Sequence, residues 1–408
     1  MLKNDPAPVP GFRYVNFRGV SVGDAAGPRV AFTGRMVGVG GRHGIFLEDP
    51  DGGPGVALAL EDDLGPTGQL FLRFERPSID GAGHVAWFAH LSAGRRGIFR
   101  DGPTTVSVLG DPVPGVAGLL HELSVPVMVD PGLVVFSATL SGGAVVGGVT
   151  IDQVILRCGG GDGNCSSGSG TLDVLVSKND PVPDRPGRRL CDLREVAASS
   201  WGIVFRASTR LDCAGVDPPV GGVFRQRFGG ALETVALAGE AAEPFPAPGG
   251  TVYASFVDEA LGIENDGIVV FQASTTQLVG TRAQYVCDPG SCPAAPAVAA
   301  VALGDAAPGG GVFRRFSAPA VTDAGDLVFS AVASGAPGLV RALYVRHPDD
   351  AIDVLALEGA AVPGSVPPAT VRRYGEPSVS PDGRVVFRAI IRNVTPPRNA
   401  RRGMFVIE

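Results

Sequence analysis

The sequence predicts an all-β fold, a seven-bladed β-propeller with four antiparallel strands in each blade. A short apolar segment with one central aromatic recurs seven times, at Val30-Ala31-Phe32, Val85-Ala86-Trp87, Val134-Val135-Phe136, Ile203-Val204-Phe205, Val269-Val270-Phe271, Leu327-Val328-Phe329 and Val385-Val386-Phe387. Its aromatics are 49 to 69 residues apart, a period typical of one copied supersecondary unit. The 59 glycines and 35 prolines cluster between apolar runs, as turns between short strands do.

Each repeat is expected to contain four strands in a fixed order. The first is a short strand that ends in a turn, as in residues 318–325, and the aromatic segment forms the second. The third strand contains another aromatic, as in Gly44-Ile45-Phe46. The fourth is aliphatic and ends in an acid and a proline turn, as in residues 106–115. Four antiparallel strands without a helical crossover are typical of a propeller blade.

The ends of the chain predict that the blades close into a ring. The last repeat stops at Glu408 without a fourth strand, and residues 3–6 repeat the Lys-Asn-Asp-Pro of residues 178–181, which end the fourth strand of the third repeat. We therefore expect the N-terminal strand to join the last blade. The alternative, an open stack of sheets, would leave two long unpaired edges. The prediction is one domain, 1–408, with approximate repeats 6–63, 64–111, 112–180, 181–240, 241–305, 306–359, and 360–408 plus 1–5.

Two sequence phrases resemble known propeller repeats. The turn at residues 378–387, Ser-Val-Ser-Pro-Asp-Gly-Arg-Val-Val-Phe, is similar to the repeat of TolB-type propellers of bacteria. The recurring Gly-Ile-Phe followed by Gly-Asp-x-x-Pro-Gly resembles the repeat of poorly characterised bacterial secreted propellers. The resemblance implies the architecture and an extracytoplasmic setting. Because it rests on structural residues, it implies no catalytic residue.

Composition and charge narrow the classes of partner. A hydrophobic content of 45% against 18% charged residues is enough for a large core. The net charge of −7, without a Lys/Arg block, argues against nucleic acid as the partner. No apolar run is long enough to cross a bilayer, so we predict no membrane span. We also predict no cofactor and a monomer.

Six cysteines fall into three local pairs: Cys158 with Cys165, Cys191 with Cys213, and Cys287 with Cys292. We expect Cys191 just before the first strand of blade 4 and Cys213 after its second, where both loops open on the same face. Even number and local pairing favour disulfides and an oxidising compartment, outside the cytoplasm or at the cell surface. Zinc is the alternative, although no Cys-x-x-Cys spacing occurs. Residues 1–6 contain no apolar segment of a signal peptide, so secretion would require a trimmed start.

Acids close most fourth strands: Asp5, Asp63, Asp111, Asp180, Glu240 and Asp305. They could form a ring that attracts a cation or a basic ligand. Because the feature is copied with each blade, we favour the alternative that each carboxylate accepts backbone N–H bonds in its own turn. Of the five histidines, His84 and His90 look like a metal pair but bracket one strand, so we expect no metal site.

Asymmetric loops offer the candidate ligand site. The loop after the second strand of blade 4 contains Arg210 and Asp212, and the corresponding segment of blade 7 contains Arg398, Arg401 and Arg402. Loops on a rigid scaffold are where function usually lies. These arginines are candidates for binding an anionic glycan or peptide, and solvated surface charge is the alternative.

The sequence favours a disulfide-stabilised binding or interaction module outside the cytoplasm, with a protein or glycan ligand on the loop face. One alternative is a propeller-fold polysaccharide hydrolase or lyase, and another is a purely structural surface module. We find no catalytic constellation in the sequence, so the enzyme question stays open. A pair of carboxylates or histidines at the mouth of the central channel would favour an enzyme.

Overall fold

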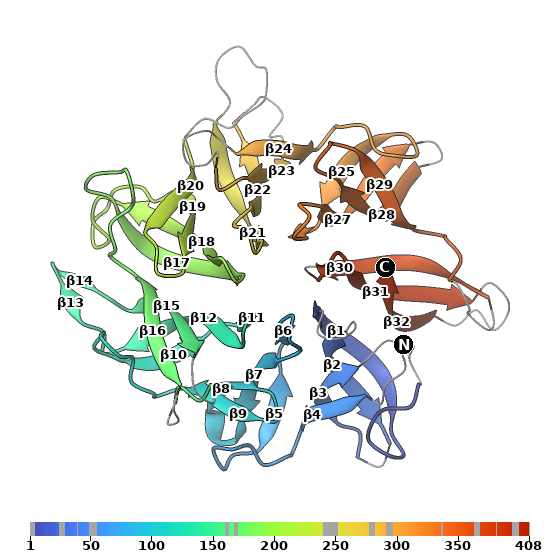
Figure 1. Cartoon of the computed structure of the whole chain (residues 1–408), viewed down its shortest axis with the longest axis horizontal. Coiled ribbons are helices and arrows are strands. Elements are labelled where there is room, and N and C mark those ends of the chain that lie inside the picture. Colours follow the sequence, from blue (N-terminus) through green and yellow to red (C-terminus); the bar gives the residue numbers. More distant parts are fainter. Residues whose placement is uncertain are drawn as a thin grey trace.

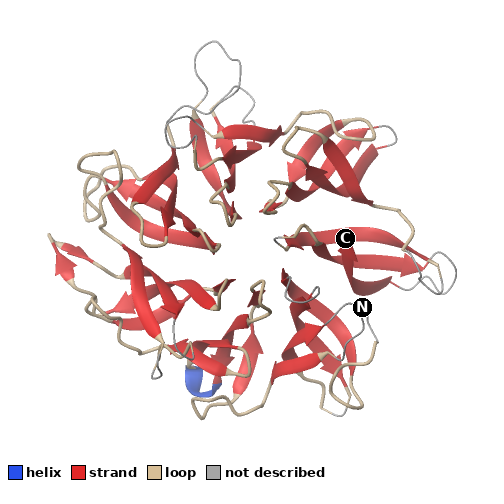
Figure 2. Ribbon diagram, in the orientation of Figure 1, coloured by secondary structure: helices blue, strands red, loops and turns tan. Residues whose placement is uncertain are grey.

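The computed structural model describes residues 5–23, 29–38, 40–48, 55–159, 163–166, 170–239, 252–276, 282–290, 297–335, 338–362, 368–380, 382–393 and 400–407. Seven antiparallel sheets stand side by side in a ring (Figure 1), which confirms the predicted seven-bladed propeller. Strands form almost all of the regular structure, and the described residues contain a single 3-10 turn, Ser92–Gly94 (Figure 2). No helix among them is long and apolar enough to span a membrane.

The strands follow the chain from the inner to the outer edge of each blade. Blade 1 contains β1 (Arg13–Gly23), β2 (Arg29–Val37), β3 (His43–Glu48) and β4 (Val56–Leu60). Blade 2 contains β5 (Phe71–Phe74), β6 (Ser78–Ile79), β7 (Val85–Leu91), β8 (Arg96–Arg100) and β9 (Thr104–Val108). Blade 3 contains β10 (Leu119–Leu123), β11 (Val127–Val129), β12 (Leu133–Ser141), β15 (Gln153–Gly159) and β16 (Thr171–Ser177), and a projecting hairpin, β13 (Val145–Val146) with β14 (Val149–Thr150).

The remaining blades repeat this order. Blade 4 contains β17 (Arg189–Ala198), β18 (Gly202–Arg210), β19 (Val220–Arg227) and β20 (Leu232–Leu237). Blade 5 contains β21 (Tyr253–Ile263), β22 (Val269–Thr275), β23 (Arg282–Cys287) and β24 (Val298–Ala302). Blade 6 contains β25 (Val312–Phe316), β26 (Ala320–Val321), β27 (Leu327–Gly335), β28 (Gly338–Arg346) and β29 (Ile352–Leu357). Blade 7 contains β30 (Ala369–Val379), β31 (Val385–Asn393) and β32 (Ala400–Ile407).

The repeated apolar segment explains how the blades hold together. Side chains alternate across a strand, so the first and third residues of the segment face one neighbour and the second faces the other. In blade 5, Val269 and Phe271 share a core with Val204 of blade 4. Val270 instead packs into the core of blade 6 beside Phe329. Each hydrophobic core therefore lies between two blades, and no blade buries its apolar faces alone.

The ring closes between blade 7 and blade 1. Val386 and Met404 of blade 7 pack in one core with Phe32 of blade 1, and the Arg388 Nη1 donates a hydrogen bond of 3.2 Å to the Phe17 carbonyl. This seam excludes the open stack of sheets. Residues 1–4 of the predicted closing strand lie outside the described residues. Two isolated bridges, Pro6 with Arg13 and Pro181 with Arg189, give the two Lys-Asn-Asp-Pro copies the same local pairing.

Aromatic pairs stiffen the middle of most blades. The aromatic of the second strand lies opposite an aromatic of the third, and the rings stack with centroids 5.4 to 6.4 Å apart, as in Phe32–Phe46, Trp87–Phe99, Phe205–Phe224, Phe271–Tyr285, Phe329–Tyr344 and Phe387–Phe405. Blade 3 replaces this pair with Phe136 and Leu156. Such stacking adds about 0.5–1.5 kcal/mol per pair beyond burial.

The inner strands are longer than the sequence predicts and are interrupted halfway. In blade 6 the predicted first strand corresponds only to β26, whereas β25 precedes it and pairs with the same neighbour, β27. The break follows an aromatic-x-x-Pro pattern, Phe74 to Pro77 in blade 2 and Phe316 to Pro319 in blade 6. Proline has no N–H to donate and therefore ends the ladder there.

Candidate functional site

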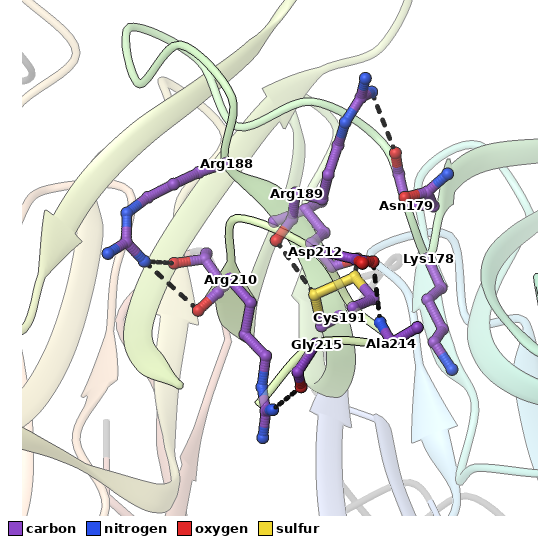
Figure 3. The surroundings of a disulfide bond; sticks show 12 residues. Lys178, Asn179, Arg188, Arg189, Cys191, Arg210, Asp212, Ala214 and Gly215 are labelled. Carbon is purple, nitrogen blue, oxygen red and sulfur yellow. Dashed lines mark hydrogen bonds between the residues drawn. A yellow bond between two sulfur atoms is a disulfide. The ribbon is translucent and has the colours of Figure 1, made fainter. Parts of the chain in front are cut away.

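The predicted arginine and acid of blade 4 stabilise their own loop. The Cys191–Cys213 disulfide is confirmed (Figure 3). The expectation that Cys191 lies just before the first strand of blade 4 is wrong, because Cys191 lies within β17. Beside the disulfide, the Arg210 Nη1 donates to the Gly215 carbonyl at 2.8 Å, and the Asp212 carboxylate accepts the Ala214 N–H at 2.9 Å. Their role in ligand binding stays a prediction.

The predicted arginines of blade 7 do not share one loop. Arg401 and Arg402 lie in β32 and pair with Ile391 and Ile390 of β31, so the expectation that they belong to a connecting loop is wrong. β31 and β32 are a longer hairpin than the sequence suggests. The Arg402 guanidinium donates to the side chain of Asn16 in blade 1. Arg398 lies outside the described residues.

A second disulfide, Cys158–Cys165, is also confirmed, seven residues apart in blade 3. These two bonds rule out zinc ligation by the four cysteines. Cys292, the predicted partner of Cys287, lies outside the described residues. Among the residues that the structure describes, no group of three or more His, Cys, Asp or Glu side chains could hold a metal ion.

Three of the acids that close the fourth strands stabilise the turns that follow. The carboxylates of Asp111, Asp180 and Asp305 each accept the N–H three residues before them, at 2.9, 2.7 and 2.7 Å. Asp63 instead pairs with Arg42 at 2.9 Å. Glu240 lies outside the described residues. The interpretation of these acids as turn-fixing groups is therefore confirmed for three blades.

The two histidines of blade 2 lie apart, each with its own carboxylate. The His84 Nδ1 is 3.2 Å from the Asp101 Oδ2, and the His90 Nε2 is 3.6 Å from the Glu75 Oε1. Both are local contacts within blade 2.

A cavity of about 470 Å³ lies between blades 6 and 7 and extends to the inner strands of blades 1 and 2. We call it the arginine cavity, because its wall contains four arginines, Arg76, Arg315, Arg341 and Arg388. Its described lining contains a single carboxylate, Glu376.

Interrupted inner strands place two of these charges, Arg76 and Glu376, whereas the other three arginines lie in paired strands. Arg76 lies in the break between β5 and β6, and Arg315 lies at the end of β25, just before the break of blade 6. Glu376 lies in β30 where the register slips between Tyr374 and Pro377. Residues at such breaks are freed from regular pairing and can project toward the cavity. The aromatic-x-x-Pro segments of blades 2 and 7 therefore place one arginine and one glutamate of the lining.

A glycine allows blades 1 and 2 to approach each other at the cavity. Gly19 has a φ of +45°, a conformation that side chains disfavour. A Cβ on Gly19 would lie 2.7 Å from both the Cα and the Cβ of Arg76. Any larger residue would therefore displace the backbone that holds Arg76.

The electrostatics of the arginine cavity are strongly positive. Burial, followed by the nearby guanidinium groups of Arg402 and Arg18, lowers the pKa of Arg388 below its ordinary value. Among the described residues, neither Arg315 nor Arg341 forms an ion pair. Four arginines against one glutamate give the lining a formal charge of +3. An anion in the cavity would relieve this repulsion between like charges.

The cavity can bind an anion more readily than it can transfer a proton. Guanidinium groups form paired hydrogen bonds with carboxylates, sulfates and phosphates. Within its described lining, Glu376 is the single carboxyl and no histidine or cysteine is present. The Tyr374 hydroxyl is buried, and this burial raises its pKa above the ordinary value. The Ser317 Oγ accepts the Ser330 N–H at 3.0 Å and so braces the cavity wall.

The opposite end of the axis is closed by turns that bond to one another. A small cavity of about 200 Å³ there is lined by all seven blades. Asp80 accepts the Gly132 N–H at 3.0 Å and Asp130 accepts the Gly81 N–H at 3.2 Å, which links blades 2 and 3. These carboxylates are engaged in joining neighbouring turns.

The same end contains a carboxyl pair between blades 5 and 6. Glu264 is 5% exposed, and burial, together with its hydrogen bond to Asp323, raises the pKa of Glu264 to about 9. Asp323 also accepts the Asn265 amide at 2.8 Å. Glu264 is therefore protonated at neutral pH and hydrogen-bonded to Asp323, whereas the two carboxyls of a glycosidase stand about 5 Å or more apart.

None of the four arginines of the cavity is among the candidate ligand-binding residues of the sequence. They lie in strands or at strand breaks, whereas those candidates were expected in loops. Arg402, which is one of those candidates, lies close enough to lower the pKa of Arg388. A usable signal was present in Phe74 to Pro77 and Tyr374 to Pro377, where charged residues occupy the middle of an aromatic-x-x-Pro segment.

Three solved structures are similar to this chain at low identity. Polysaccharide lyase Uly1 is 9% identical with a TM-score of 0.48, over 99% of this chain and 91% of that one. TolB from Acinetobacter baumannii is 12% identical with a TM-score of 0.37, over 95% and 79% of the two chains. A protein of unknown function from Dyadobacter fermentans DSM 18053 is 12% identical with a TM-score of 0.36, over 98% and 100%. At identities and TM-scores this low, the similarities say nothing about function.

No curated protein matches the sequence. One family, described as "Family of unknown function (DUF7453)", matches residues 3–155 and 150–408, nearly the whole chain. A TolB protein is thus a distant structural neighbour, and the chain itself belongs to the DUF7453 family.

Proposed function

We propose that this propeller is an extracytoplasmic binding module that holds an anionic ligand in the arginine cavity. The observation that carries the proposal is the excess of four arginines over one carboxylate in a hollow of about 470 Å³. Two disulfides are typical of proteins that work in an oxidising compartment. We expect the module to act as a monomer, which light scattering after size-exclusion chromatography would test.

Catalysis on a polysaccharide is the second candidate, and the cavity supports it less well. Hydrolysis of a glycosidic bond generally uses two carboxyl groups about 5–10 Å apart. The described lining of the cavity supplies one, Glu376. The carboxyl pair Glu264–Asp323 lies at the other end of the axis, and its two members hydrogen-bond to each other. Release of reducing ends or unsaturated products from an acidic polysaccharide would favour the enzyme instead.

Calorimetric titration at low salt with citrate, sulfate and galacturonate tests the proposal. Binding of at least one anion is expected, and Arg315→Gln should weaken it about tenfold, because one charged contact is worth roughly 1.4 kcal/mol. The neighbouring arginine in β25 supplies a matched control. Arg314 does not line the cavity, and its Nε bonds the Ser334 hydroxyl at 2.9 Å.

Arg314→Gln should therefore leave anion affinity unchanged. Equal losses in Arg314→Gln and Arg315→Gln would mean that the anion responds to surface charge and not to the cavity. Absence of binding by all three anions would favour the purely structural role for the propeller.

A further inference from the structure

We infer that the ligand of the arginine cavity is an acidic oligosaccharide of at least two sugar units, lying across blade 6 with successive acid groups on different arginines. This inference rests on the proposed anion-binding function and specifies its ligand.

The arginines of blade 6 form a row across three strands. Arg315 of β25 lies directly opposite Val332 of β27, and Val332 lies directly opposite Arg341 of β28. Residues in such a row point to the same face of the sheet, and neighbouring strands are about 4.8 Å apart. The two arginine Cα atoms are therefore about 10 Å apart. All three residues line the cavity.

The spacing separates the two positive charges. Side chains stand roughly perpendicular to a sheet, so the two guanidinium groups keep much of the separation of their Cα atoms. Two acid groups at about this spacing can pair with both guanidinium groups while the like charges of the two arginines stay apart. A ligand that satisfies both carries two acid groups on consecutive units of a chain. The volume of about 470 Å³ also exceeds what a single small anion would fill.

The centre of the row is apolar. Val332, which is partly exposed, lies between the two arginines and lines the cavity. A sugar ring has an apolar face of C–H groups that can cover such a surface, whereas inorganic polyphosphate has none. The Glu376 carboxylate, exposed in the same cavity, can accept hydrogen bonds from sugar hydroxyls. The row thus has an arginine at each end for an acid group, an apolar residue in the middle, and a nearby carboxylate that can accept hydroxyl hydrogen bonds. These features together match an acidic sugar chain.

Nucleic acid fits this lining less well. Single strands bind on exposed aromatic platforms, and the two aromatics of the cavity, Phe316 and Tyr374, are respectively 7% exposed and buried at the hydroxyl. The net charge of −7 also repels a long polyanion outside the cavity. An acidic peptide also carries carboxylates, as an acidic oligosaccharide does, but it lacks the ring hydroxyls.

Titration with ligands of increasing length tests the inference. The probes are galacturonic acid, its dimer and trimer, and a sulfated galactan oligosaccharide, with neutral cellotriose as the uncharged control. The galacturonate trimer, or the sulfated oligosaccharide, should bind at least tenfold more tightly than the monomer, and cellotriose at least a hundredfold more weakly than the trimer.

Two variants locate the effect in the row. Arg341→Gln should abolish the gain from monomer to trimer, because a longer ligand then meets one arginine of the row and not two. Arg314→Gln should keep the full gain. Unchanged thermal unfolding of both variants would show that the fold is intact.

The outcomes separate the two proposals. Equal affinity for monomer and trimer would overturn this inference and leave the anion-binding function standing. Tighter binding of hexaglutamate or of a six-nucleotide oligothymidylate than of every acidic oligosaccharide would also overturn it, in favour of a peptide or nucleic acid. Failure of every anion, including citrate and sulfate, would overturn the proposed function itself.

Discussion

At the scale of single residues, the structure depends on a few polar groups held in places where their ordinary chemistry changes. Glu264 is buried between turns, and its backbone carbonyl accepts the Ser199 hydroxyl at 2.6 Å. Its carboxyl lies beside Asp323, with Asp266 also contributing negative charge. Ionising Glu264 would place like charges together in a site with little water, which explains why its pKa is raised.

Replacement of Glu264 should change how stability depends on pH. The pKa of about 9 in the folded state lies above that of an unfolded glutamate, about 4.3. Between these values the folded state binds more protons, so the free energy of unfolding of the native protein falls as pH rises. Glu264→Gln lacks this pH-dependent loss of stability. Between pH 5 and pH 8 the free energy of unfolding of the variant should therefore rise by at least about 1.4 kcal/mol relative to that of the wild type, the value of one pKa unit.

Urea unfolding at several pH values between 5 and 8 would measure this gain. Glu122→Gln is the control, because Glu122 is an exposed glutamate on β10. A constant difference between Glu264→Gln and wild type across this range would show that Glu264 is ionised in the folded protein.

At the scale of elements, the loop after β18 is held by a covalent link. Cys213 in this loop is bonded to Cys191 in the inner strand β17, 22 residues earlier. The bond ties the loop face to the strand nearest the axis, and Arg210 and Asp212 add local hydrogen bonds (Figure 3). A rigid loop at this place stiffens the rim of blade 4.

Removal of this disulfide should destabilise the fold measurably. In the chain-entropy model, a closed loop of this length is worth about 3 kcal/mol, and the shorter loop of Cys158–Cys165 about 2 kcal/mol. The double substitution Cys191→Ser with Cys213→Ser should lower the free energy of unfolding more than the double substitution Cys158→Ser with Cys165→Ser. Denaturant unfolding of both variants would check it, and the reverse order would show that local packing outweighs loop length.

The inner strands show how an element creates a site. An uninterrupted strand would point alternate side chains into the two neighbouring cores. The breaks at residues 75–77 and 317–319 interrupt this alternation. The break of blade 2 contains Arg76 and the corresponding segment of blade 7 contains Glu376, whereas Arg315 of blade 6 lies just before its break. An element repeated for structural reasons therefore acquires a distinct charge in one sector of the ring.

At the scale of the whole molecule, seven shared cores bind the ring. Each contains residues from two consecutive blades. In the seam between blades 7 and 1, Val386 occupies the position that Val204 occupies between blades 4 and 5. Stability is then distributed over like interfaces, as in other repeat proteins. In a closed ring every interface is internal.

Matched substitutions at two seams should test this equivalence. Val386 and Val204 are both fully buried. Val386→Ala and Val204→Ala should each lower the free energy of unfolding by about 2 kcal/mol, with one cooperative transition, because each removes two methyl groups from a shared core. Denaturant titration followed by tryptophan fluorescence would measure both. A much smaller loss for Val386→Ala would indicate that the ring is weakly closed at blades 7 and 1.

Much of this molecule follows from the sequence alone. The seven apolar segments determined the number of blades, because side-chain alternation in Val269-Val270-Phe271 requires a neighbour on each side. Local cysteine spacing determined two disulfides, and the copied acids, such as Asp111, determined their turns. These features depend on residues close together in the chain or copied with each blade, and their physical causes are local.

The arginine cavity was decided only by the tertiary structure. Arg76 and Arg388 are more than 300 residues apart in the sequence, and they line one hollow because the ring brings the last blades back to the first. The register that aligns Arg315 with Arg341 depends on where each strand breaks and bulges. The residues that line a cavity with a charged strand residue come from distant parts of the chain. The role of such a residue therefore becomes visible only when the fold brings these strands together.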